Sequence, residues 1–90
     1  MDIRIRTLRA KAKGLEPTLQ IGKSGVQEGN IALIDRELES KHLIKIRFHK
    51  GALPEDASKA GRRALAQRLA ESTKSVVVEQ VGSVVVLYRS

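Results

Sequence analysis

A chain of 90 residues that contains no cysteine is long enough for one domain with a single hydrophobic core, and it excludes disulfides and thiolate metal sites. Seventeen Lys and Arg against ten Asp and Glu give a formal charge of +7, which favours a polyanionic partner such as nucleic acid but is also compatible with mere solubility. The longest apolar run, Val84–Tyr88, is far shorter than the roughly 18 residues of a membrane helix. We therefore expect residues 1–90 to form a single cytoplasmic domain that binds no membrane.

The first predicted element is a helix over residues 3–13. Apolar side chains recur at steps of three and four and form one face, made of Ile5, Leu8, Ala12 and Leu15. The glycine and proline that follow end the helix. Five cations lie mostly off the apolar face and make this the densest basic segment of the chain: Arg4, Arg6, Arg9, Lys11 and Lys13. We take these five residues as candidate contacts to nucleic acid.

A loop follows the next predicted strand. Thr18–Ile21 alternates as a short strand does, and the sequence Gly-Lys-Ser-Gly then interrupts any regular pattern. After this loop we predict a helix from near Val26 to Ser40, whose apolar face is Ile31, Ile34 and Leu38. Ser24 followed by Gln27 has the spacing of a capping box, so Ser24 is the candidate cap for the start of this helix.

The next predicted strand, Leu43–Phe48, alternates between apolar and basic side chains. Its apolar side chains face one way, namely Ile44, Ile46 and Phe48. Lys45 and Arg47 face the other way, as in a sheet with one solvated face. That solvated face is therefore basic, and these two cations join the candidate contacts.

A third helix is predicted to begin just after Pro54, whose fixed backbone angle suits a first turn. Its slim apolar face comprises Ala57, Ala60, Gly61, Ala64, Leu65 and Leu69. The Val-rich segments Val76–Val81 and Val84–Tyr88 are predicted strands, separated by Gly82 and Ser83. This pair suits a two-residue hairpin turn whose first residue has a positive φ.

The predicted order of elements is helix, strand, helix, strand, helix, strand, strand. This order belongs to the α/β class, and it predicts an α+β two-layer sandwich in which the helices cover one side of a four-stranded mixed sheet.

The Gly-x-x-Gly loop, made of Gly22, Lys23, Ser24 and Gly25, is the strongest candidate site. Because glycine has no Cβ, the backbone of such a loop can approach a phosphate closely, and the amides and positive dipole end of the following helix favour an anion. Lys23 adds a flexible cation that does not select a base. Ser24 can donate a hydrogen bond to a phosphate or cap the helix. By itself the pattern fits an ordinary tight turn as well as a binding loop, and the strand context and overall charge favour binding.

Catalytic and metal-binding hypotheses find no support. A P-loop requires a glycine where this chain has Pro17, which excludes a P-loop ATPase. His42 and His49 are isolated from each other and from any cysteine, so no metal site is expected. The carboxylates lie in contexts typical of solvated surface, and no nucleophile can be paired with a base. We therefore expect no catalytic residue, no cofactor and no enzymatic activity.

The loop and the hairpin together carry a resemblance to a known family. The residues that carry it are Leu19–Val26, Glu28–Gly29, Glu37–Leu38, Leu43–Ile46, Val81–Ser83 and Val85–Arg89. On these residues, and over nearly the whole chain, the sequence resembles the CRM domain, the chloroplast RNA splicing and ribosome maturation module, in its stand-alone YhbY-like form of prokaryotes.

This resemblance implies a fold similar to the C-terminal domain of bacterial translation initiation factor three. It implies RNA binding centred on the Gly-x-x-Gly loop, with cations of the first helix and of the exposed side of the sheet contributing, and no catalysis. Stand-alone prokaryotic members are linked with precursors of the large ribosomal subunit, whereas plant members carry several copies and assist intron splicing. The single copy favours the ribosomal role, with structured RNA, ribosomal RNA or a large-subunit precursor, as the partner.

Three alternatives remain open. In a KH domain the same loop joins two helices, whereas Pro17 and Thr18–Ile21 favour a strand before the loop here. An Alba-like protein would bind duplex DNA with comparable affinity. A basic protein-interaction module would dock its first helix on an acidic protein of ribosome assembly intermediates.

The aromatic content narrows the mode of RNA binding. One Phe, one Tyr and no Trp leave little for stacking on unpaired bases. We therefore expect recognition of the backbone and shape of a structured RNA. Nothing such as a heptad seam requires a dimer, so we expect a monomer.

Overall fold

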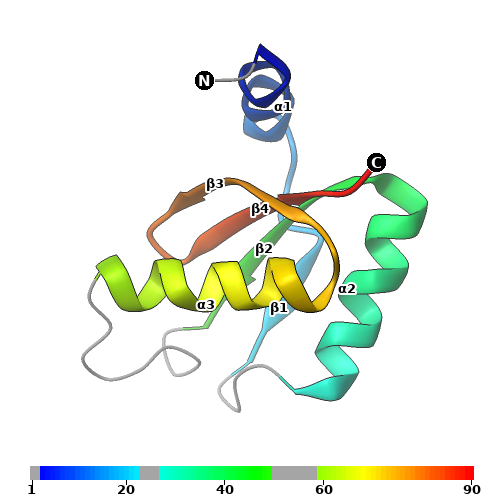
Figure 1. The fold of residues 1–90 in the computed structure, drawn as a ribbon, viewed down its shortest axis with the longest axis vertical. Coiled ribbons are helices and arrows are strands. Elements are labelled where there is room, and N and C mark those ends of the chain that lie inside the picture. The colour runs from blue at the N-terminus through cyan, green and yellow to red at the C-terminus, as the bar shows by residue number, and fades with distance from the viewer. Residues whose placement is uncertain (1–2, 23–26, 50–58) are drawn as a thin grey trace.

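The computed structural model describes residues 3–22, 27–49 and 59–90, and Figure 1 shows their arrangement. These residues form three helices, α1 (Ile3–Lys13), α2 (Glu28–Lys41) and α3 (Lys59–Ser72). They also form four strands, β1 (Leu19–Ile21), β2 (Leu43–Phe48), β3 (Val76–Val81) and β4 (Val84–Tyr88). The predicted order of elements is confirmed.

The four strands form one sheet in the order β1-β2-β4-β3. β1 and β2 run parallel, with Leu19 opposite Ile46, and β4 runs antiparallel to both of its neighbours. The sheet is therefore mixed, as predicted. α2 forms the crossover between β1 and β2, because two parallel strands cannot be joined by a hairpin turn.

The main core lies between one face of the sheet and the helices α2 and α3. Ile44, Ile46 and Phe48 of β2 are at most 3% exposed, which confirms the predicted inward face of this strand. They pack with Ile34 and Leu38 of α2 in one apolar cluster. Each such buried side chain stabilises the fold by about 1.5–3 kcal/mol relative to leaving it in water.

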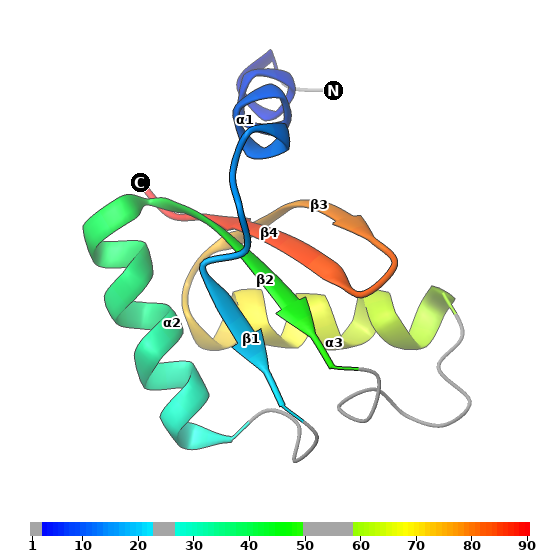
Figure 2. The same ribbon diagram turned by 180° about the vertical axis from the view of Figure 1, so that it is seen from behind.

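Helix α1 packs on the opposite face of the sheet, so the prediction that the helices cover one side is wrong for this helix. Val85 and Leu87 of β4 belong to the main core, whereas Val86 between them packs with Leu8 and Ala12 of α1. Successive side chains of a strand point to opposite faces, and both views show α1 apart from α2 and α3 (Figures 1 and 2). The physical reason is that β4 is apolar at all five positions, a pattern typical of a strand covered on both faces.

Helix α2 begins two residues after the predicted start, and its N-cap is Gln27 rather than Ser24. The side chain of Asn30 accepts a hydrogen bond from the N–H of Gln27, with 2.9 Å between nitrogen and oxygen. Serine is a preferred N-cap residue, which is why the sequence pattern favoured Ser24. Ser24 itself lies outside the described residues.

The predicted apolar face of α3 is confirmed for Leu65 and Leu69, which pack in the main core, and is wrong for Ala64. Ala66, Leu69 and Ala70 are buried, whereas Ala64, which we placed on the apolar face, is exposed. Alanine is a weak indicator of a helical face because it is tolerated both inside and outside. The predicted start after Pro54 lies outside the described residues.

The β3–β4 hairpin has the predicted turn. Val81 pairs with Val84, so the turn contains two residues, Gly82 and Ser83. Gly82 has a φ of 57°, a region that glycine adopts without steric cost. The hairpin prediction is confirmed.

Strand β3 forms one edge of the sheet and contains a β-bulge. Its pairing with β4 shifts around Val78, where it carries an extra residue. The carbonyl of Val78 accepts a hydrogen bond from Nε of Arg9 at 3.0 Å, which links α1 to this edge. Val76 and Val81, at the two ends of the strand, are 51% and 65% exposed.

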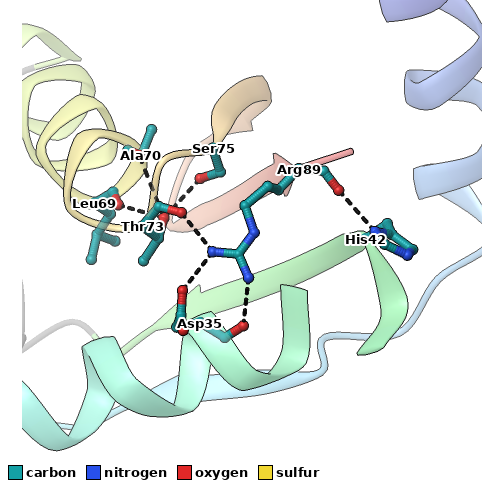
Figure 3. Close-up of polar contacts among 7 residues, drawn as sticks. All are labelled: Asp35, His42, Leu69, Ala70, Thr73, Ser75 and Arg89. Carbon is teal, nitrogen blue, oxygen red and sulfur yellow. Dashed lines mark hydrogen bonds and ion pairs between the residues drawn. The ribbon is translucent and has the colours of Figure 1, made fainter. Parts of the chain in front are cut away.

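Arg89, the residue after β4, ties that strand to α2 and α3 (Figure 3). Its guanidinium forms an ion pair with Asp35 and also donates to the backbone carbonyl of Asp35 at 2.9 Å. Nη1 donates to the carbonyl of Thr73 at 2.8 Å. The N–H of Arg89 donates to the carbonyl of His42 at 2.9 Å, and Nδ1 of His42 lies 3.0 Å from the carbonyl oxygen of Arg89. The side chain of Arg89 therefore joins β4 to the middle of α2 and to the end of α3, and its backbone joins β4 to the end of α2.

Candidate nucleic-acid interface

The predicted Gly-x-x-Gly loop begins where β1 ends. Because β1 and β2 are parallel, both strands end at the same edge of the sheet, and this edge lies at the end of the molecule away from α1 (Figures 1 and 2). The N–H of His49, just after β2, donates to the carbonyl of Ile21 at 2.8 Å. This hydrogen bond places His49 beside Gly22, the first residue of the loop.

Gly22 has open space around it. It is exposed, and a Cβ added to it would meet no atom within 4 Å. The packing of the protein itself therefore does not require a glycine at this position. A glycine that the fold does not need leaves room for the backbone of a ligand to approach. Lys23, Ser24 and Gly25, the other predicted residues of the loop, lie outside the described residues.

The first turn of α2 faces the same end of the molecule (Figure 1). First-turn N–H groups have no partner within a helix, and they carry the positive end of its dipole. Gly29 in this turn is exposed, and a Cβ added there would also meet no atom within 4 Å. Glu28 in the same turn is exposed as well, and its carboxylate stabilises the helix but repels an approaching anion. The N–H of Asn30 is already bound by Gln27, so the turn offers the amides of Glu28 and Gly29 and an open backbone, and the Glu28 carboxylate opposes a phosphate.

Arg47 is the predicted basic residue that the fold brings to this edge. It is exposed, and it pairs with Gln20 of β1 on one side and with Val84 of β4 on the other. Gln20 is also exposed and lies two residues before Gly22. Of the described residues predicted to bind RNA, Gly22 and Arg47 are therefore brought together.

Lys45 lies further from the edge and has a structural contact. Its ammonium donates to the carbonyl of Leu15 at 3.0 Å, in the segment that joins α1 to β1. Its own carbonyl accepts from the N–H of Thr18 at 2.8 Å. This predicted binding residue therefore helps to hold the connection between α1 and the sheet.

The predicted cations of α1 lie at the end of the molecule opposite Gly22 (Figures 1 and 2). Arg9 is half-buried and holds the carbonyl of Val78, as described above. The other four cations are exposed, namely Arg4, Arg6, Lys11 and Lys13. The predicted RNA-binding residues therefore lie at two opposite ends of the molecule. One RNA can contact both ends only if it extends along the longest dimension of the protein, about 35 Å.

Sequence reasoning did not include His49 or Gly29 among the site residues. A helix that joins two parallel strands brings the residues after both strands to one edge, and this rule could have indicated His49. The signal for Gly29 was a glycine inside a predicted helix, where it costs about 0.5–1 kcal/mol relative to alanine and so suggests another reason for its presence.

Among residues 3–22, 27–49 and 59–90, no three His, Asp or Glu side chains gather as they would around a metal ion. His42 holds the carbonyl of Arg89 and caps α2 with a φ of 67°. No helix in these three ranges has the length and apolar character needed to cross a membrane.

Comparison with known sequences gives a consistent result. The sequence model of the CRS1/YhbY (CRM) domain family matches residues 2–89. A probable RNA-binding protein of Methanocaldococcus jannaschii is 39% identical over 84 residues, which cover 93% of this chain and 59% of that relative. A probable RNA-binding protein of Bacillus subtilis is 34% identical over 84 residues, which cover 93% of this chain and 81% of that relative. The chain thus spans less than two thirds of the archaeal protein.

A solved structure shares the fold. The solution structure of a hypothetical protein from Staphylococcus aureus, described as a candidate RNA-binding protein, matches with a TM-score of 0.78 and 35% sequence identity. The match covers 98% of this chain and 85% of the other.

Proposed function

Because the chain belongs to the CRS1/YhbY (CRM) domain family that its sequence resembles, we propose that it is a non-catalytic RNA-binding protein that grips the backbone of structured RNA. The relatives described above are named as RNA-binding proteins and not as enzymes. The proposed contacts are the loop Gly22–Gly25 and the adjoining Arg47. For an RNA long enough to reach both ends of the molecule, the exposed cations of α1 are added.

The observation that carries this proposal is the open backbone where β1 and β2 end. The space beside Gly22 and Gly29 admits a phosphate close to the main chain. The first turn of α2 supplies amide donors, and Arg47 supplies a cation near the same edge, on the face of the sheet opposite α2. Fixed donors beside an open protein backbone suit the phosphate group of any nucleotide. Such contacts to the RNA backbone contribute affinity without recognising the base sequence.

The aromatic side chains support a backbone mode over base stacking. Phe48 is only 3% exposed and belongs to the main core. Tyr88 is half-buried against α1. These are the only aromatic residues of the sequence, so the protein lacks the exposed rings on which single-stranded bases stack.

We further propose that the RNA is ribosomal and that the protein acts in assembly of the large ribosomal subunit, as a cytoplasmic monomer. The match to the CRM domain family over residues 2–89 supports this role, because the family resemblance links prokaryotic members with precursors of the large subunit. A structured ribosomal RNA also offers the double-stranded backbone that a shape-reading surface requires.

A charge reversal at the loop tests the RNA site. Lys23→Glu should weaken binding to a structured RNA by roughly tenfold or more, because a hydrogen bond to a charged group contributes about 1.5–3 kcal/mol. Arg68→Glu is the control charge reversal, since Arg68 is an exposed cation of α3 that is not among the proposed contacts. Affinity is measured by fluorescence anisotropy, and folding by circular dichroism.

Equal affinity of the two variants would refute the loop assignment. A duplex DNA of matching sequence, added as competitor, separates RNA recognition from general nucleic-acid binding. Competition by DNA as strong as that by RNA would favour an Alba-like function over the proposed one.

The ribosomal role is tested by sedimentation of the tagged protein from cell lysate on a sucrose gradient, with and without RNase. We expect co-migration with precursors of the large subunit, lost after RNase treatment. Migration only with free protein would contradict the ribosomal role and leave the RNA site to be judged by the binding measurement.

A further inference from the structure

Positive charge is concentrated on the two helices that pack on either side of the β3 edge of the sheet. Val78 of this edge strand packs with α1, whereas Val77 packs with the core that contains α3, on the opposite face. α1 carries five cations and no anion, and α3 carries four cations and one anion. α2, on the side of β1 (Figures 1 and 2), carries four anions and two cations. A polyanion is therefore attracted to the β3 side of the molecule and repelled from the α2 side.

A groove runs from α1 over the β3 edge to α3. Its first part, about 610 Å³ in volume, lies along α1 and is lined by three cations of that helix, namely Arg6, Arg9 and Lys13. Its second part, about 440 Å³, lies between β3 and α3 and is lined by Arg63 of that helix. Arg9 and Glu79 line both parts, so the two parts adjoin at the edge strand. We call the whole the β3-edge groove.

The β3-edge groove has an excess of positive charge. Arg6, Lys13 and Arg63 are exposed, whereas Arg9 is half-buried and held against β3. Among the described residues that line the groove, Glu79 is the one carboxylate that opposes these four cations. Because the cations lie along the whole groove, they suit an anion with several charges in a row, such as a nucleic-acid backbone, better than a single carboxylate.

Two exposed arginines of α3 differ in the side of the helix on which they lie. Arg63 lines the β3-edge groove together with Arg9 of α1. Arg68 lines a separate hollow together with Ile31 of α2. Only Arg63 is therefore placed to act with the cations of α1, although α1 and α3 pack on opposite faces of the sheet.

From these features we propose that the RNA backbone runs from α1 over the β3 edge, and that Arg63 of α3 is a further phosphate contact. This inference rests on the proposed RNA-binding function, and it extends the interface around the edge of the sheet to the layer that contains α3. Gln67 and Gln80 also line this part of the groove. Their amide groups are donors for phosphate or ribose oxygens, and such contacts do not recognise the base sequence.

Two charge reversals on α3 test this proposal. Arg63→Glu and Arg68→Glu change the net charge equally, and both alter an exposed side chain, so a difference between them reports the position of the residue. The probe is a structured RNA long enough to reach α1. We expect Arg63→Glu to weaken its binding by roughly tenfold or more, the loss typical of a hydrogen bond to a charged group, and Arg68→Glu to have little effect. Fluorescence anisotropy measures affinity, and circular dichroism checks folding.

The neutral variants Arg63→Gln and Arg68→Gln measure the contact itself. Relative to the unchanged chain, Arg63→Gln should make the slope of log affinity against log salt shallower by about 0.7–0.9, whereas Arg68→Gln should leave the slope unchanged. Equal effects of the substitutions at the two positions would overturn the proposal. The proposed function would still stand in that case if Lys23→Glu weakens binding. Absence of RNA binding by the unchanged chain would overturn both.

Discussion

At the scale of single residues, Gly22 and Gly29 show how a ligand can be inferred from the space that a protein leaves open. Neither glycine is needed to avoid a clash within the protein, because a Cβ at either position would meet no atom within 4 Å. Gly29 moreover lies in a helix, where glycine loses more conformational entropy than alanine does. Because internal packing does not require these glycines, we infer that the open space beside them serves the close approach of a ligand.

Gly29→Ala should therefore separate stability from function. We expect the free energy of unfolding to rise by roughly 0.4–1 kcal/mol, because alanine restricts the unfolded chain and favours the helix. RNA affinity should fall, since the added methyl group occupies the space next to the first-turn amides. Thermal unfolding and anisotropy with structured RNA measure the two effects.

The reverse substitution on the same helix is the control for this prediction. Ala32 is exposed on α2, so Ala32→Gly should lower the free energy of unfolding by about 1 kcal/mol and leave RNA affinity unchanged. Gly29→Ala with full RNA affinity would show that this turn lies outside the interface.

Arg89 permits a second prediction at this scale, on stability. Arg89→Ala should lower the free energy of unfolding by about 2 kcal/mol, because two hydrogen bonds to backbone carbonyls are lost together with the ion pair. Asp35→Ala should cost less than about 1 kcal/mol, since the Asp35 side chain is 56% exposed and exposed ion pairs contribute little. Urea unfolding of both variants measures the difference, and equal losses would mean that the ion pair is the main contribution.

At the scale of elements, α1 combines two roles that its sequence pattern did not separate. Its apolar residues Leu8 and Ala12 cover the second face of the sheet. Arg9 binds the edge of that sheet, whereas Arg4 and Arg6 are exposed. Only the exposed cations of the helix are therefore suitable probes of RNA contact.

The double variant Arg4→Gln and Arg6→Gln tests whether α1 touches RNA. If both residues neutralise phosphates, the slope of log affinity against log salt should become shallower by about 0.7–0.9 for each. Binding is measured across a salt series for the variant and the unchanged chain. An unchanged slope would place α1 outside the RNA footprint and leave the loop end as the whole interface.

The sequence predicted some elements better than others for identifiable reasons. β2 and the β3–β4 hairpin were predicted with their observed bounds, because strict alternation and a glycine turn are strong local signals. The face of α3 was predicted correctly at its leucines, Leu65 and Leu69, and wrongly at Ala64, because alanine indicates a buried face only weakly. The position of α1 was predicted wrongly because α1 packs against Val86 of β4, which lies far away in the chain, and the pattern of α1 itself does not indicate this contact.

At the scale of the whole molecule, the two ends carry different chemistry. The loop end presents open backbone and the positive end of α2, whereas the other end presents the cations of α1. The sequence identified the loop from a local motif. It could not show that His49 lies beside Gly22, because that proximity follows from the parallel pairing of β1 and β2.

The overall salt dependence of RNA binding reports how many of these groups act together. If only Lys23 and Arg47 contact phosphates, the slope of log affinity against log salt should be about −1.4 to −1.8. If Arg4 and Arg6 join them on one long RNA, it should be about −2.8 to −3.6. A short structured RNA should give the first value and a longer one the second. The same slope for both RNAs would show that the molecule uses only one end.

The bulge of β3 bears on how the protein behaves in a crowded solution. A flat, valine-rich edge strand invites a strand from another molecule and can seed amyloid-like stacking. Here the extra residue at Val78 interrupts the regular spacing of that edge, and Arg9 already occupies the carbonyl there. Through the contact of Arg9 with Val78, α1 therefore also hinders the pairing of β3 with a strand of another molecule. We therefore expect a chain shortened by that helix to self-associate more readily through this edge, so that a loss of RNA binding in it would not identify which cations contact RNA.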